Sequence, residues 1–411
     1  MPSGRAIGIV TRAPTPGNVK TRLAAALGDA AAALLYAAFL RDALVGAASV
    51  PNAAITIFHP PEDDVATLAG LCPPGAGLRP EAGHGYGEIL PAALRELRVS
   101  APVAALVGAD SPGLPDKTLR AAFEALESGS ADAAICPTAD GGFCVLAVNG
   151  DYPELLRDID WSTARVYQQT VAHAERSGLR VAVLPEWYDV DQSEDLARLA
   201  SDLAGDVTLG AAATRAALRR LRAAGVSVPG GQPPWRVESR QAVFTSPWRS
   251  LVADTVTTHI GAVIDYAYLE TERAVWVVPV TDDGRVVLVR QYRHPVGEII
   301  LEVPAGGGND DILALAAREL REETGGRARE YIPLASFFPA SAHTTHEGHV
   351  VLALGVELGE PDREETELLA TVTVPYELAF DMARRGEIAD SQSALALLAA
   401  EPAIRAAFTT A

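Results

Sequence analysis

The stretch "ARELREETGG", residues 317–326, places two arginines and three glutamates within six consecutive positions. In a helix, Glu319 lies one turn before Glu322 and Glu323, so the three carboxylates share one side. Like charges at that spacing destabilise a helix by roughly a few tenths of a kcal/mol per pair. Charge-rich exposed helices are common, so the stretch alone fits either a solvated surface or a cage for a cation.

The residues before this helix favour the cage. Upstream runs "QYRHPVGEIILEVPAGGG", residues 291–308, in which an apolar strand ends in Pro304, Ala305 and three glycines. Glycines allow backbone carbonyls to approach a ligand closely. A glycine loop that leads into a helix with clustered carboxylates suits the coordination of Mg²⁺ around a diphosphate.

These residues resemble the Nudix hydrolases, whose box reads G-x5-E-x7-R-E-U-x-E-E-x-G-U. "RELREETG" (318–325) matches the second half of that box completely. With "YRHP" (292–295) and "EVPAG" (302–306), the segment is similar to the ADP-ribose and nucleoside-diphosphate-sugar (NDP-sugar) pyrophosphatases. The resemblance covers about residues 236–400 and implies an α+β Nudix fold, nucleotide or NDP-sugar substrates, and a homodimer whose interface in relatives often includes residues 236–258.

The resemblance also implies a role for each matching position. Glu319 and Glu323 are expected to be the principal Mg²⁺ ligands, with Glu322 a further ligand and Mn²⁺ an alternative metal. The carbonyl of Ala305 completes the coordination, and Arg318 orients the carboxylates by ion pairing. The implied chemistry is attack on phosphorus by a water whose pKa is lowered beside the cations.

The chain departs from the box in its glycine loop. Eleven residues separate Gly306 from Arg318, where the box has thirteen. Asp310 stands where the first glutamate is expected, and Gly326 replaces the final aliphatic residue. The shortened loop bears on the number of metal ions and on the rate more than on the fold.

Two positions outside the box are also expected at this site. Arg293, within "YRHP", is expected to bind the substrate. A further acidic residue in this family often comes from a loop between later strands, and Glu347 in "ASAHTTHEGHVV" (340–351) is the candidate for a ligand or base. Three histidines of that loop form only a weak zinc pattern.

The first half of the chain offers an anion site after its first apolar strand. In "RAPTPGNVKTRLAAALG" (12–28), Pro16 and Gly17 predict a turn, and Lys20 and Arg22 then fall at the start of a helix. Cations and free N–H groups at a helix N-terminus attract anions such as phosphate. The alternative is a surface loop with two ordinary basic residues.

Aspartates elsewhere in this half favour the anion site. Asp110 lies just beyond the apolar run "PVAALVG", and "YDVDQSEDL" supplies Asp189 and Asp191. Asp140 is followed by two glycines in "ADGGFCVLAV". In an α/β fold, aspartates at strand ends commonly face the ligand crevice.

Together these motifs resemble a GT-A-like family of glycosyltransferases encoded near arsenosugar-type gene clusters, related to 2-phospholactate guanylyltransferases and molybdenum-cofactor nucleotidyltransferases. The matching motifs are P-G-x-x-K-T-R-L (16–23), G-x-D-S-P (108–112), D-G-G (140–142), W-S-T (161–163) and D-V-D (189–191). The resemblance covers about residues 5–200 and implies a Rossmann-like α/β fold.

This resemblance implies that Asp110 and Asp191 hold Mg²⁺ and that Lys20 and Arg22 bind the phosphates of the nucleotide. The nucleotide-binding positions expected in full are Gly17, Lys20, Arg22, Asp140 and Gly141. One departure matters, because the expected Q-x-G-D-L-G reads "AGHGYGEIL" (82–90) and lacks the Gln and Asp. Trp161 fits either stacking on a base or sugar, or packing in the core.

The patterning predicts two domains. Residues 1–205 alternate short apolar runs with helical patterns, which indicates an α/β domain on a largely parallel sheet. Residues 206–235 hold one more helix and the Pro/Gly run "VPGGQPP", which predicts a linker. Residues 236–411 include two strands around an Asp283-Gly284 turn, a hairpin signal, and predict the α+β domain.

Composition restricts the partners. The net charge of −19 argues against a nucleic-acid or anionic-membrane surface. Cys72, Cys136 and Cys144 show no C-x-x-C spacing, which fits a reducing cytoplasm. No signal peptide is expected from the first residues, and the most apolar long stretch is interrupted by Arg41 and Asp42, so no membrane span is expected.

The leading hypothesis is a bifunctional enzyme. Its first domain is expected to be a Mg²⁺-dependent nucleotidyltransferase or glycosyltransferase that acts on an NTP or NDP-sugar. Its second domain is expected to be a Mg²⁺-dependent pyrophosphatase for an NDP-sugar or ADP-ribose-like diphosphate. The alternative is a first domain that binds a nucleotide without turnover and regulates the hydrolase.

Overall fold

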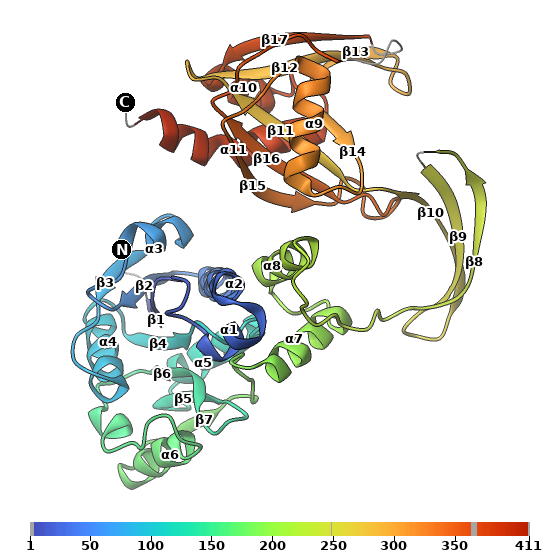
Figure 1. Cartoon of the computed structure of the whole chain (residues 1–411). Coiled ribbons are helices and arrows are strands. Elements are labelled where there is room, and N and C mark those ends of the chain that lie inside the picture. Colours follow the sequence, from blue (N-terminus) through green and yellow to red (C-terminus); the bar gives the residue numbers. More distant parts are fainter. Residues whose placement is uncertain (1–3, 248, 363–367, 410–411) are drawn as a thin grey trace. The chain divides into compact units, whose positions relative to one another are not determined.

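The structure of the chain is a computed structural model that describes residues 4–247, 249–362 and 368–409. It divides into two compact units, Met1–Pro234 and Trp235–Ala411. The division falls at the end of the Pro/Gly run, where neither helix nor strand can continue. Figure 1 shows the elements of each unit.

The first unit is built on a seven-stranded sheet in the order β3-β2-β1-β4-β6-β5-β7. All neighbouring strands are parallel except β6, which runs antiparallel to β4 and β5. The strands are β1 (Arg5–Val10), β2 (Ala53–His59), β3 (Gly77–Pro80), β4 (Val103–Gly108), β5 (Ala133–Pro137), β6 (Phe143–Val148) and β7 (Val181–Val183). The strand order reverses at β1, so the loops after β1 and β4 diverge and open a crevice at their carboxyl ends.

Helices cover both faces of this sheet. They are α1 (Thr21–Leu27), α2 (Asp29–Ala48), α3 (Val65–Leu71), α4 (Tyr86–Ser100), α5 (Asp116–Glu127), η1 (Pro153–Leu156), α6 (Val166–Arg176), α7 (Ser193–Gly205) and α8 (Ala212–Ala223). On one face Ile7 of β1 packs with Leu40 of α2 and Phe123 of α5. On the other face Ala6 packs with Leu94 of α4. The alternation of inward side chains along β1 therefore feeds two cores, as expected of a doubly covered sheet.

Helix α2 is the one described helix with the length and apolar composition of a membrane span, but 61% of that stretch is buried inside the first unit. Its Asp42 is 5% exposed and accepts hydrogen bonds from the backbone N–H groups of Ala213 and Thr214, both at 2.9 Å, and from the Thr214 hydroxyl at 2.6 Å. Asp42 thus caps the amino end of α8 from another helix. From the sequence, α8 was expected to belong to the linker 206–235, whereas in the structure it is part of the first unit.

The second unit has a mixed sheet in the order β13-β12-β11-β16-β15, with β14 paired to β11 and β17 paired to β12. Its strands are β11 (Ala274–Val280), β12 (Arg285–Arg293), β13 (Glu298–Glu302), β14 (Ala305–Gly307), β15 (Glu330–Phe337), β16 (Gly348–Leu354) and β17 (Leu369–Pro375). Strands β11 and β12 form the predicted hairpin, with Gly284 at φ 74° in the turn. A positive φ suits glycine, which has no Cβ to clash.

Helices sandwich this second sheet. They are α9 (Ile312–Thr324), α10 (Tyr376–Arg385) and α11 (Ser391–Thr409). On one face Val277 packs with Leu320 of α9. On the other face Val278 packs with Phe380 of α10 and Leu397 of α11. In the described part of this unit, α9 covers one face of the sheet, and its residues Arg318, Glu319 and Glu323 contact β14.

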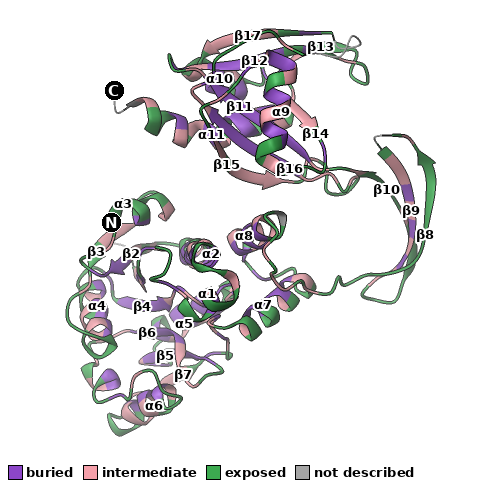
Figure 2. Ribbon diagram, viewed as in Figure 1, coloured by how far each residue is buried: buried purple, intermediate pink, exposed green. Residues whose placement is uncertain are grey.

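A separate three-stranded antiparallel sheet, in the order β10-β9-β8, opens the second unit. Its strands are β8 (Arg236–Thr245), β9 (Arg249–Thr257) and β10 (Val263–Thr271). Every residue of β8 is exposed (Figure 2). Within this sheet Asp254 is 4% exposed and pairs with Arg240 at 2.8 Å.

Two candidate nucleotide sites

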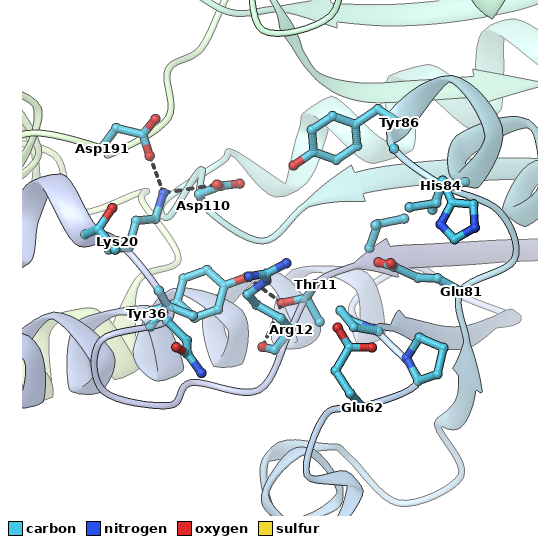
Figure 3. A pocket seen from close by; sticks show the side chains of 18 of the residues that line it. Thr11, Arg12, Lys20, Tyr36, Glu62, Glu81, His84, Tyr86, Asp110 and Asp191 are labelled. Atoms are coloured by element: carbon cyan, nitrogen blue, oxygen red, sulfur yellow. Dashed lines mark hydrogen bonds and ion pairs between the residues drawn. The ribbon is translucent and has the colours of Figure 1, made fainter.

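A cavity of about 870 Å³ lies at the carboxyl ends of β1 and β4 in the first unit (Figure 3). The register pairs Val10 with Gly108, so the loops that follow these residues leave the sheet together. The loop after β1 carries Lys20 and Arg22, the loop after β4 carries Asp110, and Asp191 follows β7; all four line the cavity. The structure thus brings together the predicted phosphate and metal residues of the first half.

Lys20 is the centre of this group. It is the N-cap of α1 and has the left-handed backbone conformation φ 45°, ψ 46°. Its Nζ donates to Asp110 Oδ2 at 3.0 Å and to Asp191 Oδ1 at 2.6 Å, and its side chain is 5% exposed. Burial alone would lower the pKa of Lys20, but the Asp110 and Asp191 carboxylates outweigh it and raise that pKa.

Tyr36 forms the floor beside Lys20. Its ring is 6.0 Å from Lys20 Nζ, and its hydroxyl hydrogen-bonds to the Thr11 hydroxyl at 2.7 Å. Burial, and then the Asp110 charge, raise the pKa of Tyr36 to about 12. Arg22 is more open, with a side chain 73% exposed and Nη1 4.0 Å from Asp191 Oδ2.

Other predicted residues lie outside the cavity wall. Gly17, at φ 82°, makes the predicted turn. Asp140 Oδ1 accepts hydrogen bonds from the Thr138 hydroxyl at 2.5 Å and from the Gly142 N–H at 3.0 Å, so it shapes the loop between β5 and β6. A Cβ on Gly141 would lie 2.2 Å from the Ala164 carbonyl oxygen, so close packing explains that glycine. The backbone of Gly17 and the contacts of Asp140 and Gly141 therefore have structural roles.

Asp189 stands near the cavity group without lining it. Burial, followed by the neighbouring charges of Asp140 and Asp191, raises the pKa of Asp189 to about 6. Trp161 packs with Tyr86 and Phe143, with ring centroids 5.8 and 6.4 Å apart. These ring contacts support the interpretation that Trp161 packs in the core.

The far end of the cavity was not predicted. It is lined by Arg12, Glu62, Glu81, His84 and Tyr86 (Figure 3). These residues follow β1, β2 and β3, so the strand-end rule that selected Asp110 also applies to them. His84 and Tyr86 come from "AGHGYGEIL", the segment that departs from the family pattern.

A second cavity, of about 630 Å³, lies in the second unit between the glycine loop and α9. The residues that line it are Gln291, Arg293, Ala305, Gly306, Gly307, Arg318, Glu319, Glu322, Glu323 and Asp362. Asp311 caps α9 by accepting from the N–H groups of Leu313 and Ala314. The cap fixes the start of the helix and hence the side that carries the glutamates.

The carboxylates of α9 lie against the glycine loop. A Cβ on Gly306 would be 2.1 Å from Glu319 Oε2, so only glycine leaves room for this carboxylate. Glu323 Oε1 accepts from the Ala305 N–H at 3.4 Å. Glu319 and Glu323 are 8% and 6% exposed, whereas the side chain of Glu322 is 38% exposed.

Arg318 links the glutamates to the loop. Its guanidinium lies 3.0 Å from Glu319 Oε1, 3.8 Å from Glu322 Oε2 and 2.7 Å from Asp310 Oδ2. It also donates to the Gly307 carbonyl at 3.0 Å. Asp310, which replaces the expected glutamate of the box, is therefore a partner of Arg318 at the edge of the loop.

Strand β12 supplies the opposite wall of this cavity. Arg293 donates through Nε to Glu302 Oε1 at 2.9 Å, and Glu302 is 3% exposed. Gln291, two positions earlier on the same face, was not predicted, although the period of two along a strand connects it to Arg293. Asp362 was missed because it lies in a long acidic run with no distinguishing pattern.

Glu347 was predicted as a ligand or base, and the structure does not bring it to this cavity. It precedes β16, and its Oε1 is 3.9 Å from His349 Nε2. Its backbone carbonyl accepts from the Ala274 N–H, which ties this part of the loop to the start of β11. Burial lowers the pKa values of His346 and His349.

The α9 glutamates and the pair Asp110 and Asp191 each fit a divalent cation whose coordination is completed by other ligands. In the described parts of the chain, no three His, Cys, Asp or Glu side chains form a complete metal-binding group by themselves. Mg²⁺ is usually held by one or two carboxylates together with water and substrate phosphates. In the first unit, an ammonium already lies within 3.0 Å of both aspartates, which shows that this pair accommodates a cation.

Comparisons with known proteins agree with this geometry. A family model described as "NUDIX domain" matches residues 270–394. Another, described as "Uncharacterized protein conserved in bacteria (DUF2064)", matches residues 43–163. The ADP-ribose pyrophosphatase of Bacillus subtilis (strain 168) is 29% identical over 165 residues, which are 39% of this chain and 88% of the relative.

The ADP-ribose pyrophosphatase of Mycobacterium tuberculosis (strain ATCC 25618 / H37Rv) is 32% identical over 169 residues, 39% of this chain and 80% of its own. A solved structure from Desulfovibrio desulfuricans G20, provisionally assigned as a nucleotide-diphospho-sugar transferase, matches with TM-score 0.50 and 30% identity, over 54% of this chain and 96% of its own. These findings confirm both fold predictions. The chain belongs to the Nudix hydrolases, and to its Nudix unit is joined a first unit that is similar to that nucleotide-diphospho-sugar transferase.

Proposed function

We propose that the second unit hydrolyses the diphosphate of an NDP-sugar or ADP-ribose-like compound in a Mg²⁺-dependent reaction. The observation that carries this proposal is the group of α9 carboxylates that lies against the glycine loop and lines the cavity with it. Two relatives named as ADP-ribose pyrophosphatases support the substrate class.

Each side chain around this cavity has a different role in the proposed reaction. Glu319 and Glu323 hold the cation, with Glu322 as a further ligand at the open edge. Arg318 fixes the Glu319 carboxylate against the loop, and Arg293 presents its guanidinium to the substrate. A divalent cation supplies neutralisation of the diphosphate and activation of water when bound.

A screen of hydrolysis tests the proposal. ADP-ribose, several NDP-sugars and dinucleotides are incubated with the full chain, with and without Mg²⁺, and monophosphate products are measured. Cleavage of at least one of these diphosphates only in the presence of the metal is expected. Turnover that persists in a chelator would contradict the metal-dependent mechanism.

For the first unit we propose Mg²⁺-assisted transfer from an NDP-sugar. It is supported by the convergence of Lys20, Arg22, Asp110 and Asp191 on one cavity, and by the similarity to the named transferase. Nucleotidyl transfer from an NTP is the competing reaction. Release of a nucleoside diphosphate from an NDP-sugar supports the first, and release of pyrophosphate from an NTP with a sugar phosphate supports the second.

A second candidate function for this unit is nucleotide binding without turnover. The ion pairs of Lys20 with both aspartates favour it, because they already neutralise part of the charge that would hold a metal. Nucleotide binding that changes the rate of hydrolysis, with no product from any donor, would establish this regulatory role.

We also propose that the protein is a homodimer and that the sheet β8–β10 forms the interface. Val237, Val243 and Phe244 of β8 are 50%, 56% and 64% exposed. Such apolar exposure on a thin antiparallel sheet is typical of a surface that meets a partner.

A further inference from the structure

The ammonium of Lys20 lies between the two carboxylates that the proposed function gives to a metal. Its Nζ is 3.0 Å from Asp110 and 2.6 Å from Asp191 (Figure 3). We propose that Lys20 and a divalent cation compete for this aspartate pair, and that phosphates of an incoming nucleotide draw Lys20 away and so admit the cation. This inference rests on the proposed nucleotide site of the first unit.

The exposure of the three side chains suits such an exchange. The Lys20 side chain is 5% exposed, whereas the side chains of Asp110 and Asp191 are 43% and 39% exposed. The carboxylates therefore face the cavity and can be reached by a hydrated ion. The ammonium occupies the position between them without itself opening to solvent.

The balance of charge explains why the exchange needs phosphate. Two carboxylates and one ammonium leave a single negative charge, which the exposed Arg22 guanidinium, 4.0 Å from Asp191, already offsets in part. A divalent cation that joined this group would make it positive, and one that displaced the ammonium would leave a buried Lys20 without a counter-ion. Burying an unpaired charge is costly. Phosphate oxygens remove this cost, because they pair with Lys20 while the cation takes the aspartates.

The surroundings of Lys20 allow movement toward the cavity. Tyr36, which lines the cavity beside Nζ, is 7% exposed and is held in place by its hydrogen bond to Thr11. The backbone of Lys20 is left-handed, at φ 45°, which is uncommon for a residue with a Cβ. Such conformations cluster at ligand clamps and switch regions.

The test measures Mn²⁺ binding by calorimetry. The full chain carries Glu319→Gln and Glu323→Gln to weaken the metal site of the second unit. In this background Lys20→Met, which keeps the length but not the charge, should bind Mn²⁺ at least tenfold more tightly than the parent in the absence of nucleotide. Adding Asp110→Asn should remove that gain, and Lys20→Arg should bind Mn²⁺ as weakly as the parent.

The outcomes separate this inference from the proposed function. If Lys20→Met gains nothing while Asp110→Asn weakens Mn²⁺ binding in the parent, the metal site exists and the competition is refuted. If Asp110→Asn changes Mn²⁺ binding in no variant, even with GTP or UDP-glucose present, the metal site itself is refuted. Should Lys20→Met fail to fold, judged by circular dichroism, Lys20→Gln replaces it with the same expected gain.

Discussion

The two carboxylate sites of this chain differ in how their negative charge is balanced. In the second unit, Arg318 lies on the same helix as the glutamates that it pairs with, and its side chain is 34% exposed. In the first unit, Lys20 reaches Asp110 and Asp191 across 90 and 171 positions of sequence and is almost fully buried. An arginine beside its carboxylates can remain in place while they bind a cation from the cavity, whereas an ammonium between two carboxylates must leave. We therefore expect the second site to bind metal alone and the first to bind it together with phosphate.

The largest expected effect is on hydrolysis by the second unit. Glu323→Gln should reduce Mg²⁺-dependent turnover by about a hundredfold or more, because charge stabilisation by the cation contributes several kcal/mol. The melting temperature without metal should change little, since the substitution keeps the shape of the side chain and also removes one of the mutually repelling carboxylates on α9. Steady-state rates at saturating Mg²⁺ give the measurement.

Arg321→Gln is the matched control for that variant. Arg321 lies on the same helix, its side chain is 53% exposed, and it is not among the residues that line the cavity. Its rate should stay within about twofold of wild type, as for ordinary surface changes. Wild-type turnover by Glu323→Gln would remove this residue from the metal site.

Nucleotide binding by the first unit should be the next most sensitive property. Asp110→Ala in the full chain should weaken Mg²⁺-dependent nucleotide binding by at least about tenfold, since even the outer partners of a metal site contribute that much. Hydrolysis by the second unit should be retained. Calorimetric titration with GTP and UDP-glucose measures it, and Asp151→Ala, an exposed aspartate outside the cavity, is the control. Unchanged affinity in Asp110→Ala would reject this strand-end ligand.

A smaller effect distinguishes Arg318 from Lys20, the two basic side chains that pair with the carboxylates. Arg318→Gln should slow hydrolysis by about tenfold, because Arg318 orients ligands and does not itself hold the metal. It should leave Mn²⁺ affinity equal or weaker, in contrast to the tighter binding expected of Lys20→Met. Tighter Mn²⁺ binding by Arg318→Gln would mean that both sites are blocked by their own cations, and the comparison would then fail.

The sequence was sufficient to bring together the glycine loop and the α9 glutamates of the second site, because these parts are local. The glycine loop and the α9 glutamates lie within a short segment, and helical spacing alone puts Glu319, Glu322 and Glu323 on one side. It did not predict that Glu347 stays outside the cavity lining, because a loop position does not determine the direction in which a side chain points. The contact of Asp310 with Arg318 also requires the loop to be built.

For the first site, motifs and strand ends were enough to select Lys20, Asp110 and Asp191. The direct ion pairs between them were not predictable, because three separate loops must meet at the reversal of strand order. The hairpin contacts of Asp140 and Gly141 were not predictable for a related reason. A glycine beside an aspartate suits a ligand loop and a tight hairpin equally well, and only the contact with Ala164 distinguishes them.

The position of α8 shows the same limit at the level of domains. A helix beside a Pro/Gly run is predicted to be part of a linker. Its attachment to the first unit could not be predicted, because the capping residue, Asp42, lies 171 positions earlier. A fragment 1–205 would lose the three hydrogen bonds to Asp42 and would expose the apolar side chains of α2 and α7 that pack with α8. We expect it to be less stable than fragment 1–234 by at least about 1–3 kcal/mol. Equal free energies of unfolding in denaturant would show that α8 contributes nothing to the first unit.

The smallest expected effect is on hydrolysis when the chain is cut after Pro234. If the two sites work independently, fragment 235–411 should have a kcat/KM within about twofold of the full chain.

The fragment should also remain a dimer, since the sheet β8–β10 lies within it. Three thin strands with exposed apolar side chains gain stability from a partner. Light scattering measures the mass of both proteins. Phe244→Ser together with Val243→Ser should shift both toward monomer, while Val207→Ser, which changes a more exposed valine of the first unit, should leave the full chain dimeric. A fragment that is monomeric or inactive, beside a full chain that is dimeric and active, would show that the first unit takes part in assembly, and the two sites would then have to be treated as one coupled system.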